Sequence, residues 1–182
     1  VYLTKAIEVD LIKIMYRTTQ TLRILALIVP VLALCSISTA IHAANNLWVG
    51  TTLDGKKCTG SEIPFGPYDY LQRAKFPGEL QVVEDNHFTA EVEQLIDREW
   101  AYAIADIHYT LGAWPNHHRA LQSAVTFRIR NLHSYPSNMG VAPAECYLQR
   151  AMKFSPNDPR PYMMYGVLLQ KVKQYDGALK AY

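Results

Sequence analysis

The chain has 182 residues, which suits one domain of ordinary size, and 49% of its residues are hydrophobic while 19% are charged. This composition is typical of a globular protein and argues against a disordered one. The net charge is +2, and this excess lies within residues 1–43, so the rest of the chain is neutral. A neutral body without a cluster of Lys and Arg argues against a nucleic-acid partner.

Residues 15–43 have the pattern of a secretory signal peptide. Arg17 and Arg23 supply a basic start, and a short apolar run over 24–34 follows. Small and polar residues then lead to Ala43, after which we expect cleavage. The sequence therefore predicts export to the periplasm, and contact with the membrane only through this segment.

Three alternatives to cleavage after Ala43 remain open: cleavage after Ala40, a retained anchor and lipidation at Cys35. Cleavage after Ala40 also satisfies the small-residue requirement, and an uncleaved segment would be an inner-membrane anchor, although a spanning helix needs about 20 apolar residues. Cys35 is a candidate for lipidation, but the preceding Leu34 is larger than the residue normally found there. Residues 1–14 precede Met15, a natural start, and are interpreted as upstream, non-native sequence.

Two cysteines remain after removal of the signal peptide, Cys58 and Cys146. In an oxidising compartment a pair of thiols is a disulfide candidate. The alternative for Cys146, which falls on a predicted helix, is a small buried hydrophobic residue. Neither cysteine has a CxxC partner or a histidine at metal-ligand spacing.

Residues 44–83 are predicted to form an irregular arm. Turn-forming pairs such as Asp54-Gly55, Gly66-Pro67 and Pro77-Gly78 interrupt any helical period. Several aromatic residues are expected to anchor this arm on the helices: Trp48, Phe65, Tyr68 and Tyr70. The alternative is that Gly66–Tyr70 forms a recognition patch.

Apolar residues recur at helical spacing after the arm. They predict one helix over about 89–98 and a second from Trp100 to Pro115. A third follows Asn116, and the turn-forming residues 135–140 mark its end. Thr89 and Asn116 are the expected N-caps of the first and third of these helices.

Two prolines are expected to begin the later helices. A turn cluster over 135–140 precedes a helix that begins at Pro143 and ends near Phe154. Pro161 opens the next helix, and Gly177 falls in the one after it.

The C-terminal residues follow a fixed spacing of small and large side chains. In the final unit these are Tyr162, Tyr165, Gly166, Leu169, Tyr175, Ala178 and Tyr182, and in the unit before it Ala144, Leu148, Ala151 and Pro156. This pattern resembles the tetratricopeptide repeat (TPR), a helix–turn–helix unit of about 34 residues. The resemblance implies an all-α fold, a TPR-like solenoid in which antiparallel helix pairs form an α-α superhelix. The alternative is an unrelated helical domain.

The repeat frame divides residues 84–182 into three units. They are 84–117, 118–158 and 159–182, the middle one with an insertion of about seven residues around Ser134–Val141. The last unit stops at Tyr182, before its second helix is complete, so we expect further repeats in the native protein.

No residues are assigned to catalysis, to a cofactor or to a metal. His117 and His118 are adjacent on a helix, so their side chains point about 100° apart and do not chelate one ion together. A metal would need another ligand, such as His87 or His108, and we expect capping and surface roles instead. Neither a spaced nucleophile nor a Gly-rich phosphate loop is present.

The TPR resemblance implies an exported, non-catalytic scaffold that binds a protein or peptide in a concave groove. The residues expected to line it are Gln122, Val125, Arg128, Met163 and Gln170. Three further segments, Gly66–Tyr70, His87–Glu93 and Pro115–Leu121, resemble exported proteobacterial TPR proteins of unassigned function.

Two other functions remain open. The first is a small metal-binding or enzymatic module built on the arm, using Cys58 with His87, His117 and His118. The second is a structural role in envelope assembly, in which the repeats hold a complex together without a defined peptide ligand.

Overall fold

Helices dominate the computed structural model, which describes residues 48–61, 63–96, 100–132 and 140–182. These residues belong to one unit, and within them the only β-pairing is an isolated bridge between Thr51 and Lys57. The all-α fold class is thereby confirmed. The predicted signal peptide, residues 15–43, and the segment before it lie outside the described residues, as does most of the predicted insertion.

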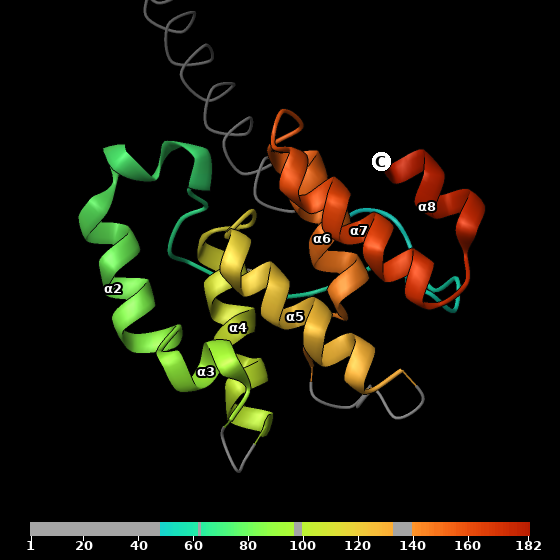
Figure 1. The fold of residues 1–182 in the computed structure, drawn as a ribbon. Helices are drawn as coiled ribbons and strands as arrows, with labels where there is room; N and C mark the ends of the chain where they lie inside the picture. Colours follow the sequence, from blue (N-terminus) through green and yellow to red (C-terminus); the bar gives the residue numbers. More distant parts are fainter. Residues whose placement is uncertain (1–47, 62, 97–99, 133–139) are drawn as a thin grey trace, which may run out of the picture. The chain divides into compact units, whose positions relative to one another are not determined.

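Figure 1 shows the helices coloured along the chain, from α2 in green to α8 in red. In chain order they are the 3-10 helix η1 (Tyr70–Lys75), α2 (Pro77–His87), α3 (Ala90–Gln94), α4 (Trp100–Ala113), α5 (His118–Arg130), α6 (Ala144–Phe154), α7 (Pro159–Lys171) and α8 (Tyr175–Ala181). Helix α4 packs on α2, α3 and α5, whereas α7 packs on α5, α6 and α8.

The arm is irregular only as far as Asp69, because η1 begins at Tyr70, so the prediction of an irregular segment to residue 83 was wrong. The Asp69 carboxylate accepts a hydrogen bond from the Leu71 amide at 2.9 Å and caps η1. Pro77 then stands in the first turn of α2. A proline is tolerated there because the amide that it lacks would have no partner within the helix.

One expected N-cap and one expected helix start also differ. His117, and not Asn116, caps α5, because its Nδ1 atom accepts a hydrogen bond from the Ala120 amide at 3.1 Å. Helix α7 begins at Pro159, two residues earlier than expected, because the Asp158 carboxylate accepts from the Arg160 amide at 3.1 Å.

Helix α3 is shorter than the predicted 89–98. It ends at Gln94 because Leu95 adopts a left-handed backbone conformation, with φ of 56°. Its N-cap residue is Thr89, as expected from the sequence.

Two clusters of buried side chains form the core. The larger one joins α3 to α7 and includes Ile107, Leu121 and Leu148. The smaller one surrounds Trp114, just after α4, and contains aromatic residues of the arm and η1 together with Val83 and Leu80 of α2. The packing of the aromatic arm on the helices, which the sequence predicts, is therefore present in the described residues.

Candidate functional site

A small groove lies between α5 and α7. Its volume is about 160 Å³, and it is lined by Gln122, Val125, Arg160, Met163, Met164 and Val167. Met163 is 54% exposed and Val167 is 40% exposed, although both are large apolar residues. The groove therefore presents apolar surface to solvent along one face of α7.

Three of the five predicted groove residues line this groove: Gln122, Val125 and Met163. Gln170 does not line it, and its side chain accepts a hydrogen bond from the Tyr182 hydroxyl at 3.4 Å. Arg128 is buried on α5, so the structure places it in the interior and not in the groove.

Sequence reasoning missed three of the lining residues. They are Arg160, Met164 and Val167, which together with Met163 follow an i, i+3, i+4, i+7 spacing on α7. This spacing places all four side chains on one helix face. This spacing was the signal in the sequence from which the whole face could have been predicted.

The charged side chains of the two helices that form the groove are all basic. Neither α5 nor α7 contains Asp or Glu. Arg119 pairs with Glu84 and Glu93, and its pKa is raised mainly by the hydrogen bond to Glu93. Arg160, at the groove itself, forms no ion pair with any residue that the structure describes.

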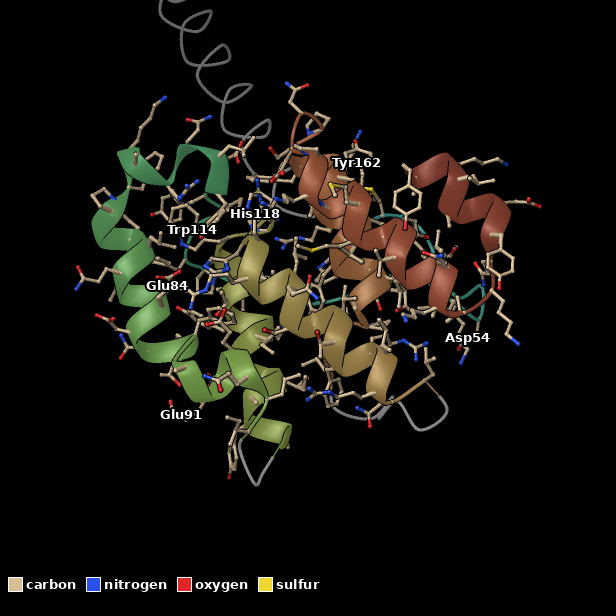
Figure 2. The ribbon with its side chains drawn as sticks, in the orientation of Figure 1. Asp54, Glu84, Glu91, Trp114, His118 and Tyr162 are labelled. Atoms are coloured by element: carbon tan, nitrogen blue, oxygen red, sulfur yellow. A yellow bond between two sulfur atoms is a disulfide. The ribbon has the colours of Figure 1, made fainter. Side chains whose placement is uncertain are left out.

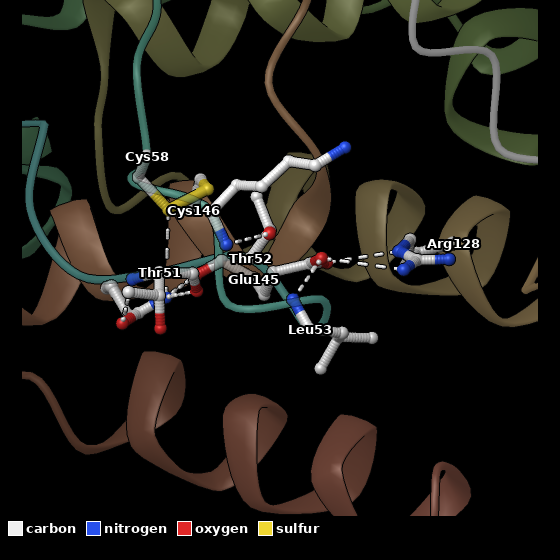
Figure 3. The surroundings of a disulfide bond; sticks show 9 residues. Thr51, Thr52, Leu53, Cys58, Arg128, Glu145 and Cys146 are labelled. Atoms are coloured by element: carbon white, nitrogen blue, oxygen red, sulfur yellow. Dashed lines mark hydrogen bonds and ion pairs between the residues drawn. A yellow bond between two sulfur atoms is a disulfide. The ribbon is translucent and has the colours of Figure 1, made fainter.

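Arg128 forms a buried ion pair with Glu145 of α6 (Figure 3). Its Nε atom lies 3.1 Å from Glu145 Oε2, and Oε1 of the same carboxylate accepts a hydrogen bond from the Leu53 amide at 3.0 Å. The guanidinium also donates to the Leu132 carbonyl at 3.3 Å. Arg128 thus ties α5 to α6 at a point where α6 also holds the arm.

A disulfide between Cys58 and Cys146 joins the arm to α6, with the two Cα atoms 5.5 Å apart (Figure 3). This is the pairing that the sequence left open. Near it, the Gln149 side chain donates to the Thr51 carbonyl at 2.7 Å and accepts from the Thr51 amide at 3.2 Å. The arm is therefore held on α6 by a covalent bond and by paired hydrogen bonds.

Asn116 lies at the centre of a buried polar cluster. Its amide nitrogen donates to Asp69 at 2.8 Å and to Asp158 at 2.9 Å, and its oxygen accepts from the Tyr70 amide at 2.9 Å. His118 also contacts Asp158, with 2.8 Å between Nε2 and Oδ2. Because these partners come from the arm, α5 and the start of α7, the cluster fixes three separate segments together.

His117 is fully buried, and its Nε2 atom lies 2.9 Å from Oε1 of Glu84. Glu84 lies on α2 and is labelled in Figure 2. The pKa of His117 is lowered, chiefly by burial; Glu84 acts in the opposite direction, and Arg119 and His118 lower the pKa further. The hydrogen bond from His117 in turn lowers the pKa of Glu84. This pair connects α2 to α5 and leaves no ring nitrogen of His117 available to a ligand.

The residues considered for a metal-binding or enzymatic module do not converge. Cys58 is in the disulfide, His117 is paired with Glu84, and His118 contacts Asp158. No group of three or more His, Cys, Asp or Glu side chains in the described part of the chain is arranged to hold a metal ion.

The arm also supplies a contact that the sequence did not indicate. Ser61 Oγ lies 2.7 Å from His108 Nε2, and His108 Nδ1 contacts the Tyr147 hydroxyl. Burial lowers the pKa of His108, and the nearby Arg150 lowers it further. These three residues link the arm, α4 and α6.

The residues of the repeat pattern divide by burial. Those at the helix contacts are buried: Ala144, Leu148, Ala151, Gly166, Leu169 and Ala178. Tyr162 and Tyr165 are half-buried, and Pro156, Tyr175 and Tyr182 are exposed. The small residues therefore lie where helices approach one another.

Comparison with known proteins adds no assignment to this geometry. No protein-family model matches the chain, and no curated protein or solved structure matches it significantly. Within the residues that the structure describes, no helix has both the length and the apolar character needed to cross a membrane.

Proposed function

We propose that the protein is a TPR-type scaffold of the periplasm that binds a peptide segment of a partner protein in the groove between α5 and α7. The single observation that carries this proposal is the exposed apolar face of α7, with Met163 and Val167 opposite Val125 of α5. Exposed apolar residues that gather in a groove mark a binding surface more often than isolated ones do.

The charge around the groove defines the chemistry of the peptide. Arg160 lines the groove, and the two helices that form it carry no acidic side chain. A guanidinium binds a carboxylate through two parallel hydrogen bonds. We therefore expect the peptide to place an apolar side chain on Met163 and Val167 and an Asp or Glu beside Arg160.

The TPR-like arrangement is supported by the order of helix contacts. Helices α5 and α6, and then α7 and α8, are consecutive contacting helices, and α5 also contacts α7. In a TPR array the first helices of successive units line the groove, which is the place of α5 and α7 in the repeat frame. The disulfide agrees with an exported protein, because such bonds persist in oxidising compartments.

Selection from a displayed random peptide library, with the isolated peptides then measured by fluorescence anisotropy, tests the proposal. Met163→Glu places a carboxylate in the groove and should weaken the selected peptides about tenfold or more, which corresponds to about 1.4 kcal/mol. Tyr102→Glu is the matched control, because Tyr102 is also an exposed apolar residue but lies on α4, outside the groove lining.

The expected peptides pair an apolar residue with an acidic one, bind the Tyr102→Glu variant normally and lose affinity for the Met163→Glu variant. Arg160→Glu should reduce the preference for acidic peptides. Selected peptides that bind the wild type and the Met163→Glu variant equally well would overturn the proposal.

A further inference from the structure

A second and larger cavity lies between α2, α4 and the arm. Its volume is about 410 Å³, and it is lined by Phe65, Val82, Val83, Asn86, His87 and Tyr109. None of these residues lines the groove between α5 and α7. The volume falls within the range of about 300–1,000 Å³ that is usual for small-molecule sites.

The walls of this cavity are mostly apolar. Val83 is buried in the smaller core cluster, and Phe65 and Tyr109 pack against the same cluster. Aromatic and branched aliphatic side chains of this kind favour a flat, apolar ligand, because such a ligand removes apolar area from water on both partners.

One polar group at the cavity is held in a fixed orientation. His87 Nδ1 lies 2.8 Å from Asp106 Oδ1, and the imidazole is stacked on the Tyr109 ring with 3.8 Å between the ring centroids. A carboxylate accepts hydrogen bonds, so the neutral imidazole carries its proton on Nδ1. The lone pair is then on Nε2, for which no described residue is a partner.

The other polar side chain at the cavity, Asn86, uses only part of its hydrogen-bonding capacity within the protein. Asn86 donates from its amide nitrogen to the Val82 carbonyl at 2.7 Å. Its oxygen remains an acceptor, as does His87 Nε2. The cavity therefore offers acceptors for a ligand that carries a hydrogen-bond donor.

We propose that this cavity binds a small aromatic alcohol, with the ring between Phe65, Val82 and Tyr109 and the hydroxyl donating a hydrogen bond to His87 Nε2. Asp106 is a positioning residue in this site, because it sets the tautomer of His87 and does not line the cavity. The site is separate from the peptide groove, so the test of this proposal does not depend on the proposed scaffold function.

The test compares 4-cresol with 4-methylanisole, which has a similar ring but no hydroxyl donor. Titration into the isotope-labelled protein, followed by NMR, gives the affinity and the location of each compound. The ¹⁵N shifts of the His87 ring report its tautomer in the same sample. We expect saturable shifts at Val82, Val83 and His87, and about tenfold tighter binding of 4-cresol, the usual effect of one hydrogen bond.

Three variants make the test specific. His87→Phe keeps the stacking on Tyr109 but removes the acceptor, so 4-cresol should bind about as weakly as 4-methylanisole. Asp106→Leu removes the acceptor that holds the ring proton on Nδ1, so the neutral imidazole can carry the proton on Nε2, and the preference for the hydroxyl should fall. Asp85→Asn removes an exposed charge on α2 outside the cavity and should change neither affinity.

The spectrum of each variant also shows whether it is folded. The proposal is overturned if the wild type binds the two compounds equally, if neither binds at millimolar concentration, or if folded His87→Phe still prefers 4-cresol. A wild-type His87 ring protonated on Nε2 in the neutral form would overturn it as well.

Discussion

Gly66 of the arm lies directly against the carbonyl oxygen of Ala113 at the end of α4. A methyl group added at Gly66 would lie 2.4 Å from this oxygen, and Gly66 has a φ of +91°. The same carbonyl accepts a hydrogen bond from the Tyr68 amide at 2.8 Å. The arm therefore approaches α4 through its backbone, at a position where only glycine fits.

Gly66→Ala should lower the free energy of unfolding by about 2–4 kcal/mol, the sum of left-handed backbone strain and overlap with a backbone oxygen. Gly55→Ala is the matched control, because Gly55 has a φ of +79° but no atom within 4 Å of the added methyl group. In Gly55→Ala only the backbone strain should lower the free energy of unfolding, by about 1 kcal/mol. Urea denaturation measures both values; equal losses would contradict the close approach of Gly66 to Ala113.

Removal of the disulfide should destabilise the protein by about 2–4 kcal/mol, because the bond closes a long loop and so restricts the unfolded chain. The cysteines are separated by 88 residues. Cys58→Ser combined with Cys146→Ser should lower the urea midpoint, and added reductant should lower it for the wild type but not for the double variant. A wild-type midpoint that reductant does not change would contradict the contribution of this bond.

Substituting only one partner of the buried ion pair between Arg128 and Glu145 should strongly lower the free energy of unfolding. Glu145→Gln leaves the guanidinium buried without its charge partner, and we expect a loss of about 3–5 kcal/mol. Arg128→Met should lower the free energy of unfolding by a similar amount, because it leaves the Glu145 carboxylate without this partner.

The combination of Arg128→Met with Glu145→Gln should recover part of this loss, because no uncompensated charge is then buried. A double-mutant cycle by urea denaturation measures the coupling. Purely additive losses would show that the two side chains do not stabilise each other.

The sequence predicted helices at α6, α7 and α8 because the spacing of apolar and small residues is a local signal. Ala144, Ala151 and Ala178, which this spacing predicts at helix contacts, are all buried in the structure. The start of α2 was missed because Pro77-Gly78 was interpreted as a break, although proline is also favoured in a first helical turn.

The position of Arg128 depended on tertiary structure. Its helical spacing to Leu121 and Val125 places it on a buried face of α5, but its charge favoured an exposed site. The partner that makes burial possible, Glu145, stands on another helix, and local sequence patterns do not report such a pairing. The ring contact between His87 and Tyr109 depends on packing in the same way.

Acidification should destabilise the protein through His117. Its pKa is lowered in the folded state, chiefly by burial, so the unfolded chain takes up a proton first as the pH falls below the ordinary value of 6.5. The free energy of unfolding should therefore fall from pH 7.5 to 5.5, with His108 contributing in the same direction. His117→Asn keeps a capping side chain but does not titrate, and should show a smaller fall in urea denaturation; an equal fall in both proteins would contradict the role of His117.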